Sequence, residues 1–211
     1  MTEAAFVTRQ DDYLEFATRT LDVSSPLNVI AHLERARRDT SFAFDPSVIE
    51  PDSFAATFRA IDNFWDTIDF TVLYLLNLWY GYGEVLAAAT RDAIAARFLT
   101  FKYWYTEPTP AGLVDHKWYW SENHRIIFHV DEYLAGHAFP DATFTNDGRT
   151  GAAHAQVAET RIRPLTDPLR MNGCALVLLG EGEGIEAELE PVCRWTAETL
   201  GDGGAARLYA L

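Results

Sequence analysis

The chain has 211 residues, of which 48% are hydrophobic, 13% are aromatic and 23% are charged. This composition predicts one folded domain with a sizeable core, or one domain with an appendage, and excludes wholesale disorder. The formal net charge is −14, which excludes nucleic acid as a partner because its phosphates would be repelled.

The charged residues and the cysteines also bear on the environment of the protein. Only Lys102 and Lys117 are lysines among the 17 basic residues. An acidic surface with few lysines fits a halophilic protein, and a GC-rich genome that favours arginine codons is the alternative. Cys174 and Cys193 have neither metal-finger nor disulfide-scaffold spacing, so we expect a reducing, cytoplasmic location. We expect no secretory signal, no membrane span and no membrane partner. The oligomeric state stays open.

The first half of the chain predicts a series of helices. The first is expected over residues 2–21, where apolar side chains recur at helical spacing. Ser25 and Pro26 have the residue types of an N-cap and a first helical position, and they open a second helix with a basic end. After a loop at residues 39–51, further helices are expected over residues 52–65, 66–80 and 85–103, with a glycine stop at 81–83. The apolar faces of the first two helices comprise Phe6, Tyr13, Phe16 and Ala17, and Leu27, Ile30 and Leu33.

The second half predicts two more helices and then changes character. Ser121 is expected to cap a helix that ends near residues 136–140, and another helix starts at Thr150 or Gly151 and ends before Pro164. Beyond it, a buried strand at residues 174–179 precedes a glycine-rich turn and an acidic helix. That order is typical of a nucleotide-binding turn, but the glycine spacing differs and two glutamates would face the phosphate. We therefore expect a plain turn and no cofactor.

These elements together predict a mainly all-α fold. Successive helices with short loops pack as antiparallel hairpins, which form either a toroid or a solenoid. The absence of a fixed sequence period disfavours a regular solenoid. We expect a partial (α/α) toroid-like domain over residues 1–165. A divergent, glycine-rich tail over residues 166–211, irregular or α/β in structure, follows it.

An aromatic-rich stretch from Phe98 to Phe144 is the strongest functional signal. Rings beside carboxylates and amides bind sugars, because the apolar sugar face stacks on the ring and the hydroxyls bond to polar groups. Rings of this kind also build hydrophobic cores, and the sequence leaves both interpretations open. The candidate substrate-binding residues are Trp104, Glu107, Trp118, Trp120 and Tyr133.

Three polar residues open the helix that follows Ser121. The positive end of a helix disfavours a protonated imidazole, so His124 is expected to be a neutral base. The same helix end, together with the Asn123 amide, would hold a substrate carboxylate. Glu122 is a candidate general acid, as in a glycosidase. The alternative is an ordinary helix cap. The histidine spacing lacks a four-ligand set, so no metal is expected.

The aromatic stretch and this polar helix start carry a family resemblance. Residues 60–163 resemble a family of large uncharacterised bacterial and archaeal proteins. The helical hairpins of that family are similar to those of (α/α) toroid polysaccharide lyases and glycosidases. A looser similarity links Asn123 and His124 to toroid lyases that use an Asn–His pair. The motifs are Phe101-Lys102-Tyr103-Trp104, Glu107-Pro108, Trp120-Ser121-Glu122-Asn123-His124, Glu132-Tyr133-Leu134-Ala135-Gly136, Phe139-Pro140 and Phe144-Thr145-Asn146.

The resemblance ends near Pro164. The family continues with Trp-Leu and further helices, whereas Pro164 and Leu165 stand here, so the chain resembles a truncated copy. The resemblance implies a carbohydrate-active domain, either a lyase or a glycosidase, with acidic polysaccharide as a candidate substrate. The alternative is a non-catalytic helical domain for binding or assembly, or an inactive fragment of a larger protein.

Overall fold

The computed structural model describes residues 3–171 of the chain. Seven α-helices make up most of this part, which contains no β-strand, and the prediction of a mainly α-helical fold is confirmed. The strand expected at residues 174–179 and nearly all of the 166–211 tail lie outside the described residues. The helices are α1 (Glu3–Ala17), α2 (Pro26–Arg38), α3 (Ala55–Asp62), α4 (Ile68–Tyr82), α5 (Ala88–Thr100), α6 (Glu122–Ala138) and α7 (Gly151–Met171).

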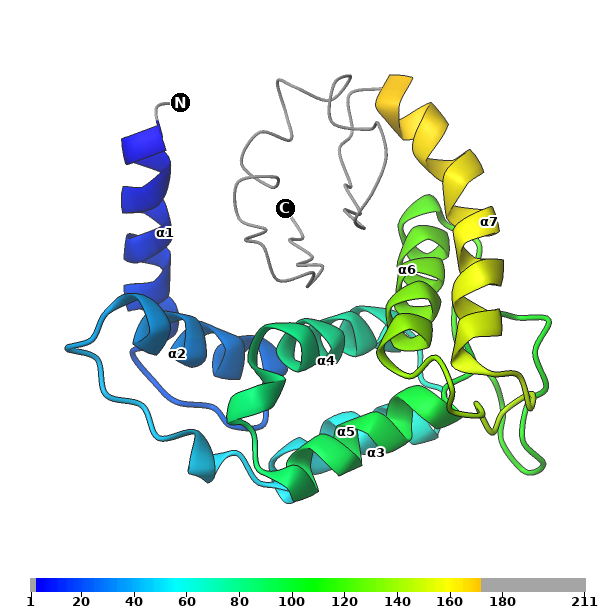
Figure 1. Cartoon of the computed structure of the whole chain (residues 1–211), viewed down its shortest axis with the longest axis horizontal. Helices are drawn as coiled ribbons and strands as arrows, with labels where there is room; N and C mark the ends of the chain where they lie inside the picture. Colours follow the sequence, from blue (N-terminus) through cyan, green and yellow to red (C-terminus); the bar gives the residue numbers. More distant parts are fainter. Residues whose placement is uncertain (1–2, 172–211) are drawn as a thin grey trace.

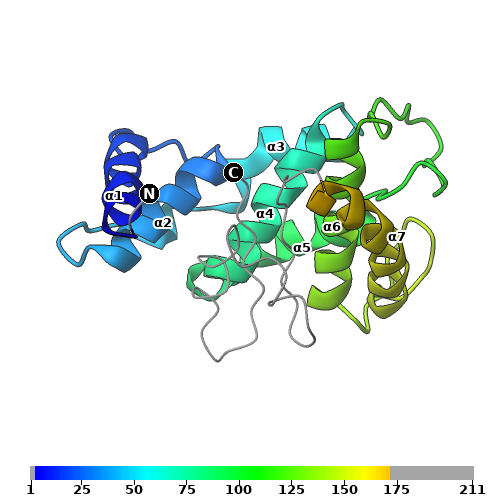
Figure 2. The same ribbon diagram turned by 90° about the horizontal axis from the view of Figure 1, so that it is seen from above.

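The helices follow an open arc (Figure 1). α1 stands at one end of the arc and α7 at the other, with α2 and α4 between them. α3 and α5 pack against each other and against α4, while α6 packs between α4 and α7. Seen from above, the long segment that joins α5 to α6 lies at the α7 end of the molecule, far from α1 (Figure 2). In the described part of the chain, no helix is both long and apolar enough to cross a membrane.

The core lies where α4, α5 and α6 meet the segment that follows α5. Helix α4 is apolar on most sides, and its buried positions face neighbours all around it. Phe101 stacks on Phe128 of α6 with ring centroids 6.2 Å apart, and Tyr119 packs on the same ring at 4.5 Å. Each of these rings removes a large apolar area from water and so stabilises the fold. Helix α4 packs directly against α6 as well.

Local residue signals set two helix starts as predicted. The Ser25 hydroxyl is the N-cap of α2 and accepts a hydrogen bond from the Asn28 amide at 3.3 Å. Pro26 takes the first helical position, where its missing amide donor costs nothing. Ser121 is likewise the N-cap residue of α6. The Ser25 signal acts within one turn, whereas the Ser121 side chain makes no capping hydrogen bond.

Other helix ends differ from the prediction. Helix α4 continues through Gly81 to Tyr82, because neither Gly81 nor Gly83 has the positive φ that a glycine stop requires. Helix α5 ends at Thr100, since Phe101 is extended and inserts its ring into the core. Helix α7 runs past Pro164 to Met171; proline lacks an amide donor, but its fixed φ is compatible with a helix.

The predicted apolar faces of the first two helices are only partly buried. Tyr13 is 64% exposed, Phe16 is 65% exposed and Leu27 is 47% exposed, whereas Leu14 and Leu33 are buried. Helix α1 stands at the end of the arc, and α2 is its main neighbour among the described helices. Sequence periodicity marks which residues share a face, but it does not tell how many neighbours the helix has.

Candidate functional site

His124 faces a carboxylate from a distant part of the chain. It lies in the first turn of α6, and Asp69 lies in the first turn of α4. His124 Nδ1 is 2.7 Å from Asp69 Oδ2, and the exposed fraction is 11% for the His124 side chain and zero for that of Asp69. When Asp69 is ionised it accepts a hydrogen bond from the Nδ1–H of the neutral imidazole, and this tautomer has its free lone pair on Nε2. Phe70 packs edge-on against the imidazole at 5.2 Å. The pair has the arrangement of an oriented general base.

A second buried carboxyl group lies near this pair. Burial raises the pKa of Asp69 to about 6, and the His124 ring acts in the opposite direction. Asp131, two turns further along α6, is fully buried, and burial and the charge of Asp69 raise its pKa well above the usual range. Neither Asp131 oxygen accepts a hydrogen bond from the described residues. Burial therefore favours the protonated, neutral form of the Asp131 carboxyl group.

The turn that leads into α4 is strained and anchored. Phe64 and Thr67 have φ values of 54° and 64°, in the left-handed region that costs non-glycine residues on the order of 1–3 kcal/mol each. The His116 amide donates to the Phe64 carbonyl at 3.0 Å, and the Trp118 amide donates to Asp66 Oδ1 at 3.1 Å. The segment that carries Trp118 is thus fastened to the start of α4.

The first turn of α6 presents polar groups to solvent. Glu122 and Asn123 are exposed, whereas His124 is buried against its partner. The Ser121 hydroxyl does not cap the helix; it is buried and has no hydrogen-bond partner among the described residues. The first amides of a helix carry a partial positive charge, which the Ser121 hydroxyl does not cap and which the Glu122 carboxylate in the same turn partly offsets. An incoming anion would meet these amides beside the Glu122 charge.

Three exposed rings lie in the segment before α6. Trp118 is 52% exposed, Trp120 is 58% exposed and Tyr105 is 45% exposed. The Tyr105 and Trp120 rings contact each other, with centroids 4.8 Å apart. We call Tyr105, Trp118 and Trp120 the aromatic platform.

The structure places two other candidate ring residues elsewhere. Trp104 is only 9% exposed, and its ring packs on His129 at 4.2 Å and on Tyr119 at 5.6 Å. Tyr133 is half-buried and contacts the His137 ring at 4.3 Å. It lies nine residues after His124, which places the two side chains on different faces of α6. Because the Trp104 ring is buried between Tyr119 and His129, it packs inside the segment before α6 and is not part of the exposed surface.

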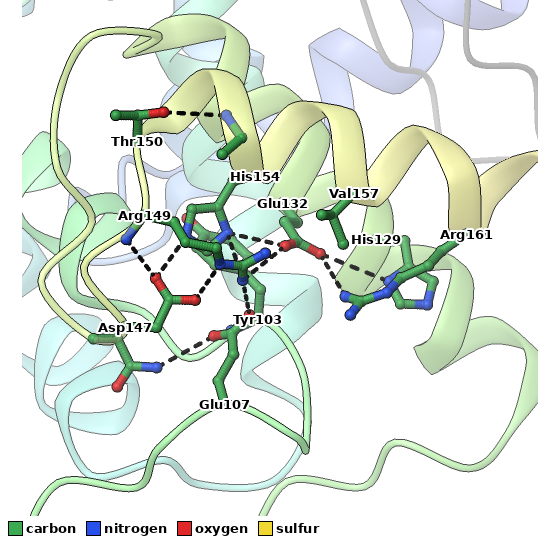
Figure 3. A network of polar contacts seen from close by, with 12 residues as sticks. Tyr103, Glu107, His129, Glu132, Asp147, Arg149, Thr150, His154, Val157 and Arg161 are labelled. Atoms are coloured by element: carbon green, nitrogen blue, oxygen red, sulfur yellow. Dashed lines mark hydrogen bonds and ion pairs between the residues drawn. The ribbon is translucent and has the colours of Figure 1, made fainter.

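Glu107 belongs to a buried polar cluster with Glu132 and His154 (Figure 3). Glu107 Oε2 accepts from the Tyr103 amide at 2.8 Å, and Glu132 Oε1 lies 2.9 Å from His154 Nδ1. Arg149 lies 3.2 Å from Glu107 Oε1 and 3.5 Å from Glu132 Oε1. The cluster joins the loop after α5 to α6 and α7, so it holds the base of the aromatic segment in place.

The same cluster contains the nearest approach to a metal-ligand set in the described residues. Ligand atoms of Glu107, Glu132 and His154 lie within 4.8 Å of one another. The carboxylates already bond to arginines, since Arg161 lies 3.0 Å from Glu132 Oε2 and Arg149 bridges both glutamates. A metal ion would have to displace Arg149. Burial and the charge of Glu132 raise the pKa of Glu107 to about 7.

Comparisons of the chain with protein families, with curated proteins and with solved structures give no match. The site is therefore defined by its own geometry.

Several polar residues of these clusters were not among the candidates from the sequence. Asp69 and Asp131 were not singled out, and neither was the grouping of Glu132 with His154. One signal was present: Asp69 is the only charged residue in the otherwise apolar stretch of α4. An isolated acid in a buried helix needs a partner, because an unpaired buried charge is costly.

Proposed function

We propose that this chain is a carbohydrate-active domain, and that it acts as a lyase on an acidic polysaccharide. The observation that carries the proposal is the Asp69–His124 pair, whose histidine follows the exposed Trp118 and Trp120 of the aromatic platform within a few residues. An oriented imidazole supplies a base, and exposed rings supply a surface for sugar faces. The open arc of helical hairpins is compatible with a partial toroid.

Binding would use the rings and the helix end. The apolar face of a sugar stacks on Trp118 or Trp120, with Tyr105 beside them. The uronate carboxylate meets the first turn of α6, where the Asn123 amide and the helix amides act as donors. Arg125 is exposed in the same turn and adds a positive charge on a chain of net charge −14. Local positive charge is needed because the whole protein repels polyanions.

The reaction would be a β-elimination. His124 Nε2 takes the C5 proton of the uronate, and the C4–O4 bond breaks as the C4–C5 double bond forms. The departing O4 takes a proton from the imidazolium or from water. Asp69 holds the imidazole in the required tautomer and stabilises the imidazolium. The donors at the helix start stabilise the charge that develops on the carboxylate.

A glycosidase is the second candidate within the same class, with the exposed Glu122 as the general acid. The non-catalytic alternative is a binding domain that uses the platform alone. We further propose a cytoplasmic, salt-adapted protein that does not bind nucleic acid, because excess carboxylates keep a chain hydrated and repel phosphates.

The products of one assay separate these possibilities. The full chain is incubated with polyuronates and with neutral polysaccharides, and both unsaturated products and new reducing ends are measured. A lyase produces unsaturated ends, which are detected by their ultraviolet absorbance. The His124→Ala variant is expected to produce none, whereas the Glu122→Gln variant should still produce them. A glycosidase releases reducing ends without unsaturation and depends on Glu122. Binding without either product indicates the non-catalytic domain, and neither binding nor product with any polysaccharide refutes the proposal.

A further inference from the structure

A pocket of about 500 Å³ lies between α1, α2 and the second half of α4, away from His124. Its size is within the range of small-molecule sites. Leu14 of α1 and Ile30 and Ala31 of α2 form apolar walls, and Tyr74 and Tyr80 of α4 contribute rings. The pocket therefore offers mainly apolar surface with aromatic faces.

Hydrogen bonds hold its tyrosines in place. The Tyr80 hydroxyl donates to the Leu134 carbonyl of α6 at 2.7 Å, so its polar tip is used by the fold and its ring remains as wall. The Tyr82 hydroxyl donates to Glu34 at 2.6 Å. Glu34 also accepts two hydrogen bonds from Arg37, at 2.6 and 2.7 Å. A ligand would thus meet a preorganised wall and lose little binding energy in ordering it.

The charge of the lining is opposite to that of the protein. Among the described residues that line the pocket, Arg9, Arg37 and Arg38 are basic and Glu34 is the only acid, so these four side chains sum to a formal charge of +2 on a chain of −14. Arg37 is matched by Glu34, and Arg38 pairs with Asp11 at 2.9 Å. Arg9 is an exposed residue of α1 that also lines the pocket, and it makes no ion pair with the described residues.

We propose that this pocket binds an amphipathic carboxylate, whose apolar body lies against the tyrosine and aliphatic walls and whose head group pairs with Arg9. An uncharged apolar molecule would forgo the charge-assisted bond to the guanidinium. The site is independent of the Asp69–His124 pair and of the reaction proposed for it.

The test measures binding of decanoate to the full chain by calorimetry, with decanol as the neutral match and acetate as the head group alone. Decanoate is expected to bind saturably, and at least about tenfold more tightly than either control. Arg9→Glu is expected to weaken decanoate binding by about tenfold or more, whereas Arg59→Glu, the same charge change at an exposed position on α3, leaves it unchanged.

A second variant tests the apolar part of the site. Ile30→Trp fills the pocket and is expected to abolish decanoate binding in a protein whose melting temperature shows that it is folded. Equal affinity for decanol and decanoate, equal effects of Arg9→Glu and Arg59→Glu, or the absence of saturable decanoate binding to the wild type would each overturn the proposal.

Discussion

Helices α6 and α7 touch at two glycines, and alanine at either position should destabilise the fold. A Cβ at Gly136 would lie 2.5 Å from the Gly151 carbonyl oxygen and 2.7 Å from the Ala155 amide nitrogen. Both neighbours are backbone atoms of α7, so neither can move aside by a rotamer change. Overpacking of this kind costs about 3 kcal/mol at its upper range. Alanine itself recovers about 1 kcal/mol of helix propensity, which leaves a net loss of about 2 kcal/mol.

Thermal unfolding of the Gly136→Ala variant measures this loss. For a chain of this length, about 2 kcal/mol lowers Tm by about 4–8 °C. Gly81→Ala is the matched control, because Gly81 is an exposed glycine of α4 with nothing within 4 Å of an added Cβ. The Gly81→Ala variant should be more stable than wild type by about 0.5–1 kcal/mol. A Gly136→Ala protein as stable as Gly81→Ala would show that α6 and α7 do not pack at this distance.

Three further predictions concern titration and binding. Burial raises the pKa of Glu107 from 4.5 to about 7. The folded state therefore holds this proton more tightly than the unfolded state, and the free energy of unfolding should fall as pH rises from 4.5 to 7. Denaturant unfolding at pH 5 and pH 8 should show that the Glu107→Gln variant becomes more stable relative to wild type at pH 8. Burial lowers the pKa of Lys117 from 10.5 to about 8. The free energy of unfolding of the wild type should therefore rise as pH is raised from 8 to 10.5. Unfolding of the Lys117→Met variant, measured over the same pH range, should lack that rise. The Trp118→Ala and Trp120→Ala variants should each bind polysaccharide about tenfold more weakly at an unchanged Tm. Trp104 is buried, so the Trp104→Ala variant should instead lose about 3–5 kcal/mol of stability. Unaltered binding in both the Trp118 and Trp120 variants would exclude the aromatic platform from polysaccharide recognition.

Helix starts that depend on neighbouring residues could be predicted from the sequence. The Ser25 hydroxyl accepts from an amide in the first turn of α2, and Pro26 follows it. Helix α6 also begins after Ser121 as predicted, but the Ser121 hydroxyl makes no capping hydrogen bond. The α4 stop at Gly81 was wrong because a glycine ends a helix only where the chain takes a positive φ, and that depends on the path of the chain beyond it.

Contacts between distant residues could not be predicted in this way. Asp69 and His124 are 55 positions apart, and only the packing of α4 on α6 brings them together. The tryptophans illustrate a second limit, because Trp104 is buried whereas Trp118 and Trp120 are exposed. All three have the same hydropathy and stand in one segment, so their exposure depends on which neighbours cover them.

The most direct test of the proposed function is the rate at which an Asp69→Asn variant releases unsaturated product from a polyuronate. Asparagine preserves the size of the side chain but cannot stabilise the imidazolium or hold its tautomer. We expect kcat to fall by at least about a hundredfold with little change in KM. Turnover equal to wild type in this variant, or no unsaturated product from the wild type itself, would contradict the assignment of His124 as the base.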